Sequence, residues 1–408
     1  MINLGWTALP RGLPGGAALA TVLEVSGKTR ILIVGAGIAR LALAAGLERG
    51  GITPAVVELQ NASLSRGLAL MVTNNATLAL RRIGLDGAVA ERGRVLERIV
   101  QTGASGNLID QHDFRQSNSR YAPNLDIMRD GLMAGLASAV RAQIRYATTI
   151  TSVDGPAGTL DVAFSDGTSA TFDLIVGADG LHSAVRKLIY PQAEPHYRSF
   201  CAWRTVMDYP DRGSIFRIRS SPGCLLGSFP VGPDLVYAFL LAHHAAVPSL
   251  SRDEHLDRFK ELASTFRGTI PSLIQQQRDP AHVIFVPVQE VVTPSYHQGR
   301  ILLIGDAAHA FPPLLAQGAA MAIEDAVALA QLLGESRDVD QVLQAYEARR
   351  RPRVETIRAA VRHLTATRGF EGPVTPELLN QHPPVFSTSL KAYDDLIEDP
   401  YARDPGFA

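Results

Sequence analysis

Three short runs of apolar, largely β-branched residues punctuate the chain, and each one leads into a turn that contains glycine. They cover residues 30–34, 172–176 and 300–304. Continuous apolar runs of this length are typical of strands that are buried on both faces of a parallel sheet. Helical periodicity follows, most clearly in the amphipathic stretch at 319–333. The pattern predicts an α/β fold with a Rossmann-type, mainly parallel sheet.

The middle of the chain has a different pattern, in which apolar and polar residues alternate over short runs separated by proline and glycine. Alternation with a period of two predicts an antiparallel sheet. Residues 251–266 have a helical pattern and lie before the last of these runs. The predicted strands are 200–206, 214–218, 224–231, 235–241 and 282–288.

These two patterns divide the chain into a discontinuous domain and an insertion. We expect the first domain to contain residues 30–191 and 293–370, with a substrate-binding β-sheet domain of residues 192–292 between them. Residues 371–408 form a C-terminal tail after a helix that ends near residue 367. Residues 1–29 are expected to be a poorly ordered leader, because only Arg11 precedes their short apolar run and a signal peptide needs a basic start and a longer apolar region.

Composition narrows the possible functions. The 408 residues include 39 Lys and Arg against 40 Asp and Glu, a formal net charge of −1, which argues against a nucleic-acid partner. A chain that is 46% hydrophobic and 19% charged can bury a core and is not expected to be disordered. No uninterrupted apolar stretch is long enough for a membrane span. The two cysteines, Cys201 and Cys224, cannot make a disulfide framework, so we expect a cytoplasmic protein.

The first glycine turn carries most of a dinucleotide-binding fingerprint. Gly35 permits a tight turn, Gly37 lets the backbone approach a pyrophosphate, and the following helix offers its N-terminus to phosphate. Glu58 lies 58 − 35 = 23 residues after Gly35, close to the spacing of about 20 for a ribose-binding carboxylate. Arg40 occupies the third glycine position, where a small residue normally lets the helix pack on the strand. An ordinary βαβ turn without a ligand remains the alternative for this segment taken alone.

Two further motifs make the assignment more specific. One is Gly-Ala-Asp-Gly-Leu-His-Ser-Ala-Val-Arg at 177–186, and the other is Gly-Asp-Ala-Ala-His at 305–309, followed by Pro312-Pro313 and by Ala-Gln-Gly at 316–318. Together they resemble the DG and GD motifs of the single-component FAD-dependent aromatic hydroxylases, the group A monooxygenases with the p-hydroxybenzoate hydroxylase fold. The resemblance runs from about residue 30 to residue 353 and is nearest to the short, salicylate-hydroxylase-like branch.

The resemblance implies roles for individual residues. Glu58 would bind the adenosine ribose, Arg66 and Arg129 would lie near the FAD, and Asp306 would accept hydrogen bonds from the ribityl chain. Asp179 would serve FAD and NAD(P)H, directly or by shaping its loop, and residues 312–318 would line the isoalloxazine ring. The predicted cofactor-binding residues are Gly35, Gly37, Ile38, Ala39, Glu58, Arg66, Arg129, Asp179, Asp306, Pro313, Gln317, Gly318 and Ala319.

The inserted sheet would cover the substrate pocket above the flavin, as it does in the family. No catalytic side chain is assigned, because the chemistry belongs to the flavin, and no Cys/His cluster has the spacing of a metal site. The predicted substrate-binding residues are Trp203, Arg204, Phe229, Tyr237, Phe239 and Pro312.

The implied function is that of a monooxygenase that uses FAD, NAD(P)H and O₂. It would hydroxylate or epoxidise a small aromatic or polyketide-like substrate through a flavin C4a-hydroperoxide, as a monomer or homodimer. The alternative is a protein of the same fold that uses FAD without redox chemistry, for cyclisation or isomerisation, or that binds FAD weakly. Arg40 motivates this alternative because it departs from the fingerprint where the cofactor is held.

Overall fold

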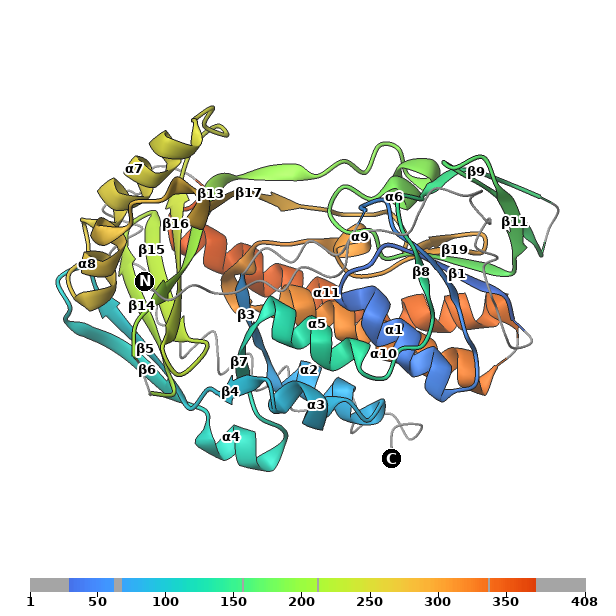
Figure 1. The fold of residues 1–408 in the computed structure, drawn as a ribbon, viewed down its shortest axis with the longest axis horizontal. Helices are drawn as coiled ribbons and strands as arrows, with labels where there is room; N and C mark the ends of the chain where they lie inside the picture. Colours follow the sequence, from blue (N-terminus) through green and yellow to red (C-terminus); the bar gives the residue numbers. More distant parts are fainter. Residues whose placement is uncertain (1–28, 62–67, 156–157, 211–212, 337, 372–408) are drawn as a thin grey trace, which may run out of the picture.

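The computed structural model describes residues 29–61, 68–155, 158–210, 213–336 and 338–371. Almost all of the predicted leader and tail, and Arg66 with them, lie outside these residues. Figure 1 shows an elongated molecule with a sheet at each end and helices running between them. Among the described helices, none combines the length and the apolar character needed to cross a membrane.

A six-stranded sheet forms one end of the molecule, in the order β18-β19-β12-β1-β2-β8. Its pairs are parallel except at the edge, where β18 runs antiparallel to β19, and the predicted mainly parallel sheet is thus confirmed. The register pairs Val34 with Gly177, and Gly177 with Leu303, so the three glycine turns meet at one edge. The strands are β1 (Ile31–Val34), β2 (Ala55–Val57), β8 (Ile144–Arg145), β12 (Leu174–Gly177), β18 (His297–Gln298) and β19 (Ile301–Leu303).

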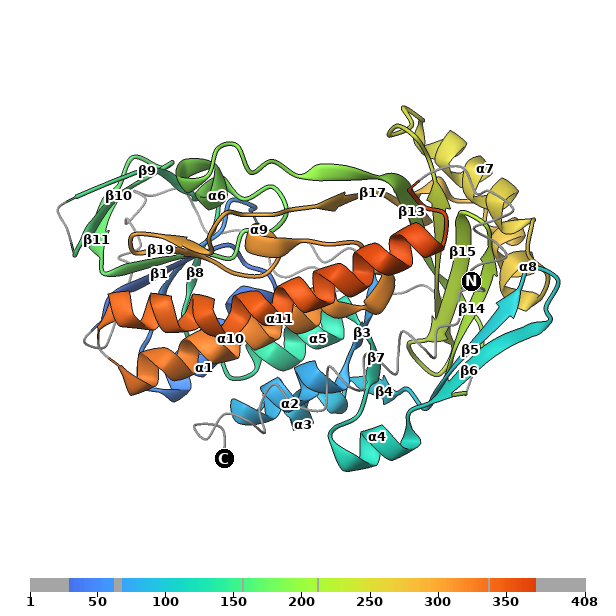
Figure 2. The ribbon, with the colours of Figure 1, turned by 180° about the vertical axis from the view of Figure 1, so that it is seen from behind.

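Helices cover one face of this sheet, and Figures 1 and 2 show α1, α5, α10 and α11 side by side there. The packing of α1 on α10 is close, because a Cβ added at Gly46 would lie 2.7 Å from the Cβ of Ala330. Smaller elements surround this layer. The helices are α1 (Ile38–Arg49), α2 (Asn74–Arg82), α3 (Asp86–Ala90), α4 (Arg115–Arg120), α5 (Arg129–Ala137), α6 (Ala184–Ile189), α9 (Asp306–His309), α10 (Gln317–Glu335) and α11 (Val339–Thr367).

Two three-stranded antiparallel sheets accompany the six-stranded one. One follows the order β11-β10-β9, and the other follows β3-β7-β4 and lies toward the opposite end of the molecule. The strands are β3 (Ala69–Val72), β4 (Gly93–Val95), β7 (Leu125–Met128), β9 (Ile150–Asp154), β10 (Leu160–Phe164) and β11 (Ser169–Phe172).

A seven-stranded sheet in the order β17-β13-β16-β15-β14-β5-β6 forms the other end. Two of its strands, β5 and β6, come from outside residues 192–292, and β5 pairs with β14 in parallel. The sequence did not indicate this addition, because pairing between distant strands leaves no local signal. The strands are β5 (Arg98–Gly103), β6 (Leu108–Asp113), β13 (His196–Asp208), β14 (Ile215–Ser221), β15 (Cys224–Pro230), β16 (Leu235–His243) and β17 (Ile284–Glu290).

Two helices, α7 (Arg252–Ala263) and α8 (Thr269–Gln276), cover the outer face of this sheet. Ser251 starts α7 with a capping box, in which its hydroxyl accepts from the Glu254 backbone N–H and the Glu254 carboxylate accepts from the Ser251 backbone N–H. This start matches the helix predicted at 251–266. Short 3₁₀ turns lie at Pro280–His282 and Pro313–Leu315.

A largely buried ionic cluster joins α10 to α11. The Glu324 carboxylate accepts hydrogen bonds from Arg350 Nη1 and from Arg353 Nε, both at 2.7 Å. The Asp325 carboxylate accepts from Arg350 Nε, also at 2.7 Å. Burial by itself would raise the pKa of Glu324, but the charges of Arg353 and Arg350 outweigh this effect and lower the pKa to about 2. The folded state therefore favours the ionised form of this carboxyl group.

Replacing Glu324 with Gln should destabilise the protein by about 3–5 kcal/mol at pH 7, because the change leaves the buried guanidinium of Arg350 and the largely buried one of Arg353 without this partner. The loss should depend on pH. A folded-state pKa below the unfolded value of about 4.3 stabilises the protein at higher pH, and this contribution disappears as pH falls through about 2. In urea unfolding, the difference between the two proteins should therefore begin to shrink below about pH 5 and should close near pH 2.

The matched control is Glu261→Gln, which removes an exposed partner of Arg258. That variant should lose less than about 1 kcal/mol at every pH. A Glu324→Gln deficit that stays constant down to pH 3 would contradict the assignment of a low pKa to Glu324.

Candidate active site

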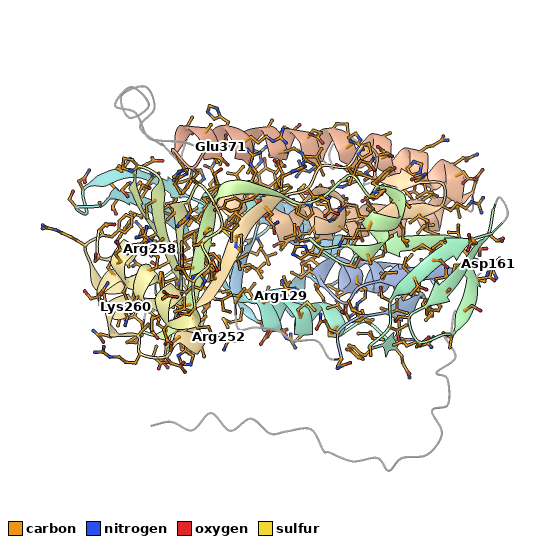
Figure 3. All side chains as sticks on the ribbon, turned by 90° about the horizontal axis from the view of Figure 1, so that it is seen from above. Arg129, Asp161, Arg252, Arg258, Lys260 and Glu371 are labelled. Carbon is orange, nitrogen blue, oxygen red and sulfur yellow. The ribbon has the colours of Figure 1, made fainter. Side chains whose placement is uncertain are left out.

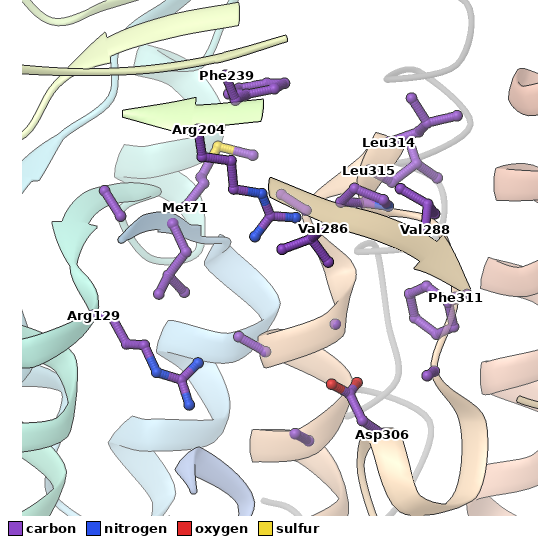
Figure 4. A pocket seen from close by; sticks show the side chains of 18 of the residues that line it. Met71, Arg129, Arg204, Phe239, Val286, Val288, Asp306, Phe311, Leu314 and Leu315 are labelled. Carbon is purple, nitrogen blue, oxygen red and sulfur yellow. The ribbon is translucent and has the colours of Figure 1, made fainter. Parts of the chain in front are cut away.

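A cavity of about 470 Å³ lies between the turns of the six-stranded sheet and the inner face of the seven-stranded sheet. A volume of this size accommodates a small organic ligand or part of a larger cofactor. Figure 4 shows Arg129 and Asp306 at one end of the cavity, and Arg204 with Phe239 at the other. The two ends differ in chemistry, since backbone and charged groups dominate the first and aromatic and aliphatic side chains dominate the second.

The start of α1 forms part of the first end, through Gly37, Ile38 and Ala39. A Cβ placed on Gly37 or on Gly180 would have no neighbour within 4 Å, so the backbone at both positions faces open space. No side chain caps α1. The first N–H groups of a helix lack intrahelical acceptors and favour anions, so this end is suited to phosphate groups.

Arg129 and Asp306 add the charged groups of this end. The guanidinium of Arg129, at the start of α5, makes no hydrogen bond or ion pair with any residue that the structure describes, and its backbone N–H donates to Leu68 O at 2.7 Å. Figure 3 places Arg129 between the two ends of the molecule, whereas Arg252, Arg258 and Lys260 gather at α7. Arg129 is thus free to bind an anionic ligand.

Asp306 begins α9, and its side chain is open to the cavity while protein surrounds it closely. Burial raises the pKa of the Asp306 carboxyl group, and the nearby His309 and Arg129 act against the rise. A carboxylate here can accept hydrogen bonds from ligand hydroxyls. The combination of a helix start, a guanidinium and a carboxylate along one wall fits the diphosphate and the polyol chain of FAD.

The loop before α10 forms the next part of the wall with Pro313, Gly318 and Ala319. Ala316 has φ +53° and precedes the first residue of α10. A non-glycine residue in this left-handed conformation costs roughly 1–2 kcal/mol, so the surrounding packing must hold the loop in place. Strained backbone of this kind is common at ligand sites.

Gln317 and Pro312 do not line the cavity, in contrast to the prediction. The Gln317 side chain is buried and holds the loop to α2, because its Oε1 accepts from Asn75 Nδ2 at 3.0 Å and its Nε2 donates to Thr73 Oγ1 at 3.2 Å. Both residues are buried, Pro312 before the left-handed turn at Ala316 and Gln317 directly after it. Nothing in the sequence indicated this supporting role, because the partners of Gln317 lie far away along the chain.

Asp179 and Gly35 shape turns and do not line the cavity. The carboxylate of Asp179 accepts from Ser183 Oγ at 2.5 Å and from the backbone N–H groups of Ala184 and Val185, and so it fixes the start of α6. Gly35 has φ +113°, and a Cβ there would stand 2.4 Å from Ala178 O. Only glycine allows the two turns to approach so closely.

Glu58 stands at the end of β2, beyond the cavity itself. Its Oε1 accepts from the Gln60 backbone N–H at 2.8 Å, and the side chain is half-buried. The placement next to the α1 turn is the one expected for a residue that binds the adenosine ribose. Arg66 lies outside the described residues.

The substrate end is formed by side chains of the seven-stranded sheet, and four of the predicted residues line it. These are Arg204, Phe229, Tyr237 and Phe239. The ring of Phe239 packs directly on Gly227, where a Cβ would lie 2.3 Å from the ring. Sequence reasoning missed Phe216, whose ring packs against Phe229 and Phe239, although alternation in β14 places it on the same face.

Trp203 was wrongly assigned to this end. It is fully buried on the opposite face of the sheet, beneath α7, where its ring contacts Phe285 and His255. Successive residues of a strand point to opposite faces, so Trp203 and Arg204 cannot both face the cavity. The residue type did not indicate which face of the strand Trp203 lies on, because tryptophan is common both in cores and in pockets.

Arg204 is a charged group among the apolar walls of the substrate end. Its guanidinium makes no hydrogen bond or ion pair with the described residues. Burial raises the pKa of the Tyr237 hydroxyl, and the positive charge of Arg204 acts against this rise. Arg204 therefore offers donors and positive charge to an oxygen atom of a bound ligand. Within the described residues, no group of His, Cys, Asp and Glu side chains could hold a metal ion.

The fold and the first end of the cavity define an FAD-binding flavoprotein, and comparison with known proteins agrees. The sequence profile of a family described as "FAD binding domain" matches residues 28–361. The chain belongs to this family, that of the salicylate- and p-hydroxybenzoate-type FAD-dependent monooxygenases, and it is an oxidoreductase that binds FAD.

Relatives and solved structures extend this result. Aurachin C monooxygenase/isomerase of Stigmatella aurantiaca is 33% identical over 333 residues, which cover 78% of this chain and 84% of that protein. The 2-heptyl-3-hydroxy-4(1H)-quinolone synthase of Pseudomonas aeruginosa is 30% identical over 344 residues, covering 80% and 86%. The crystal structure of Klebsiella pneumoniae HpxO with FAD and uric acid shares the fold, with a TM-score of 0.76, 23% identity and coverage of 91% and 94%.

Replacing Arg129 with Met should weaken FAD binding by roughly 10- to 100-fold, because one charge-assisted contact to the diphosphate is lost. Flavin fluorescence titration of the apoprotein measures this change. Arg258→Met, on the exposed side of α7, is the matched control and should bind FAD as the unchanged protein does. Equal FAD affinity in both variants would exclude Arg129 from the cofactor site.

Proposed function

We propose that the protein consumes NAD(P)H and O₂ to insert one oxygen atom into a small, planar aromatic compound that carries an acidic oxygen. The observation that carries the proposal is the continuity of the cavity, which joins the cofactor end to the aromatic end next to Arg204. A ligand ring at the aromatic end would therefore lie beside the flavin ring without a separate channel.

The residues of the first end would hold FAD along its length. Glu58 would bind the adenosine ribose, the start of α1 and Arg129 the diphosphate, and Asp306 the ribityl hydroxyls. The backbone of residues 313–319 would lie against the isoalloxazine ring. When bound, FAD supplies the transfer of electrons from NAD(P)H to O₂ and of oxygen to the substrate.

The substrate end would position the ring and tune its reactivity. Phe216, Phe229 and Phe239 supply flat apolar surfaces that favour an aromatic ligand and exclude water. The guanidinium of Arg204 would bind a phenolate or enolate oxygen and so favour the deprotonated, electron-rich form of the ring. The choice of substrate class is supported by one relative, whose name, 2-heptyl-3-hydroxy-4(1H)-quinolone synthase, refers to a hydroxylated aromatic compound.

Turnover assays test the proposed reaction. With a panel of hydroxylated benzoates, hydroxypyridines and 4-quinolones, at least one compound should stimulate NADH or NADPH oxidation and give a product that carries one ¹⁸O atom from ¹⁸O₂. Omission of O₂ should abolish the product. Turnover of a compound in the absence of both NAD(P)H and O₂ would overturn the proposal in favour of a non-redox cyclase or isomerase.

Replacing Arg204 with Met should raise KM for the acidic substrate by roughly 10- to 100-fold, since a buried charge-assisted contact is removed. Arg204→Lys keeps the charge and should recover part of the loss. FAD affinity should stay unchanged in both variants, because Arg204 lies at the far end of the cavity from Arg129. An unchanged KM for Arg204→Met would remove Arg204 from the substrate site.

A further inference from the structure

Arg40 occupies the third glycine position of the fingerprint, and the fold accommodates it without breaking the turn. It is the third residue of α1, and its side chain is only 3% exposed. The β1–α1–β2 unit is intact around it, because Gly35 N–H donates to Val57 O at 2.8 Å and α1 begins at Ile38. The arginine is therefore packed inside the unit and does not turn outward into solvent.

The buried guanidinium of Arg40 is incompletely satisfied. Its Nε is buried and has no hydrogen-bond partner among the described residues. Burial lowers the pKa of Arg40 to about 10, while Tyr146, Glu58 and Glu48 act in the opposite direction. Arg40 stays protonated at neutral pH, so the protein holds a buried positive charge at the start of α1.

The groups that act on Arg40 lie where the adenosine half of FAD is expected. Glu58 N–H donates to Arg145 O at 2.9 Å, which brings Glu58 next to Tyr146 at the ends of β2 and β8. The Glu48 carboxylate is already engaged, since it accepts from the backbone N–H groups of Arg141 and Ala142. By contrast, the Glu58 carboxylate accepts only from Gln60 N–H among the described residues, and its second oxygen remains for a ligand.

We infer that Arg40 is a positioning residue for the adenosine half of FAD. Its charge orients the Glu58 carboxylate toward the ribose hydroxyls. The substitution of the third glycine by arginine thus strengthens cofactor binding. The inference concerns the cofactor and not the substrate, so it does not depend on the proposed reaction.

A double-mutant cycle on FAD affinity tests the inference, with Arg40→Met, Glu58→Gln and the combined variant as apoproteins titrated with FAD. Arg40→Met keeps much of the side-chain volume and should bind FAD about tenfold more weakly. The FAD affinity of the combined variant should equal that of Glu58→Gln to within about twofold, because Arg40 acts through Glu58. Arg40→Lys should recover most of the affinity. Fully additive losses, or no loss in Arg40→Met, would overturn the inference.

Two further measurements separate this role from packing. ADP should compete with FAD about tenfold less effectively in Arg40→Met, whereas the apoprotein of this variant should unfold at the same temperature as the unchanged apoprotein or at a higher one, because a buried charge has been removed. Riboflavin, which lacks both the adenosine and the diphosphate, should give the same fluorescence response with Arg40→Met as with the unchanged protein. Arg40→Gly restores the usual fingerprint, and tighter FAD binding by this variant would show that Arg40 hinders the cofactor and would overturn the inference.

Discussion

A single buried carboxylate, that of Asp325, holds the turn on which the cofactor end of the cavity depends. Its Oδ2 accepts from the Gly305 backbone N–H at 2.9 Å and lies 2.6 Å from His309 Nε2, while Oδ1 accepts from Arg350 Nε at 2.7 Å. Burial by itself would raise the pKa of Asp325, but His309 and Arg350 hold it well below its usual range. Asp306 follows Gly305, so its position depends on the hydrogen bond from Gly305 to Asp325 of α10, which Arg350 of α11 holds in place.

The two ends of the cavity are built in different ways, and this difference separates cofactor binding from substrate choice. Glycine turns and a helix start form the cofactor end, so backbone geometry determines its shape. Side chains on strands form the other end, where Phe229, Phe239 and Arg204 belong to the seven-stranded sheet and not to the glycine turns. A family that keeps one cofactor and acts on many substrates needs this separation.

Local signals predicted the parts of the site that depend on backbone. The three glycine turns, the parallel sheet and the residues at the start of α1 followed from runs and motifs that lie within a few residues of one another. Trp203 was misplaced because alternation defines two faces of a strand but does not say which face is the cavity. Gln317 was misplaced because its partners Asn75 and Thr73 lie more than two hundred residues away.

Arg40 shows how a departure from a motif can be informative once its surroundings are known. The sequence indicated that it would disturb the packing of α1, yet the helix is intact and the side chain is buried. A positive charge near a helix N-terminus is unfavourable because the helix dipole is positive there, and burial adds to that cost. The negative charge of Glu58 offsets part of both costs, and a ligand that binds only the folded state also stabilises it. Residues such as Arg40, which strain the free protein at a ligand site, therefore couple cofactor binding to the stability of the fold.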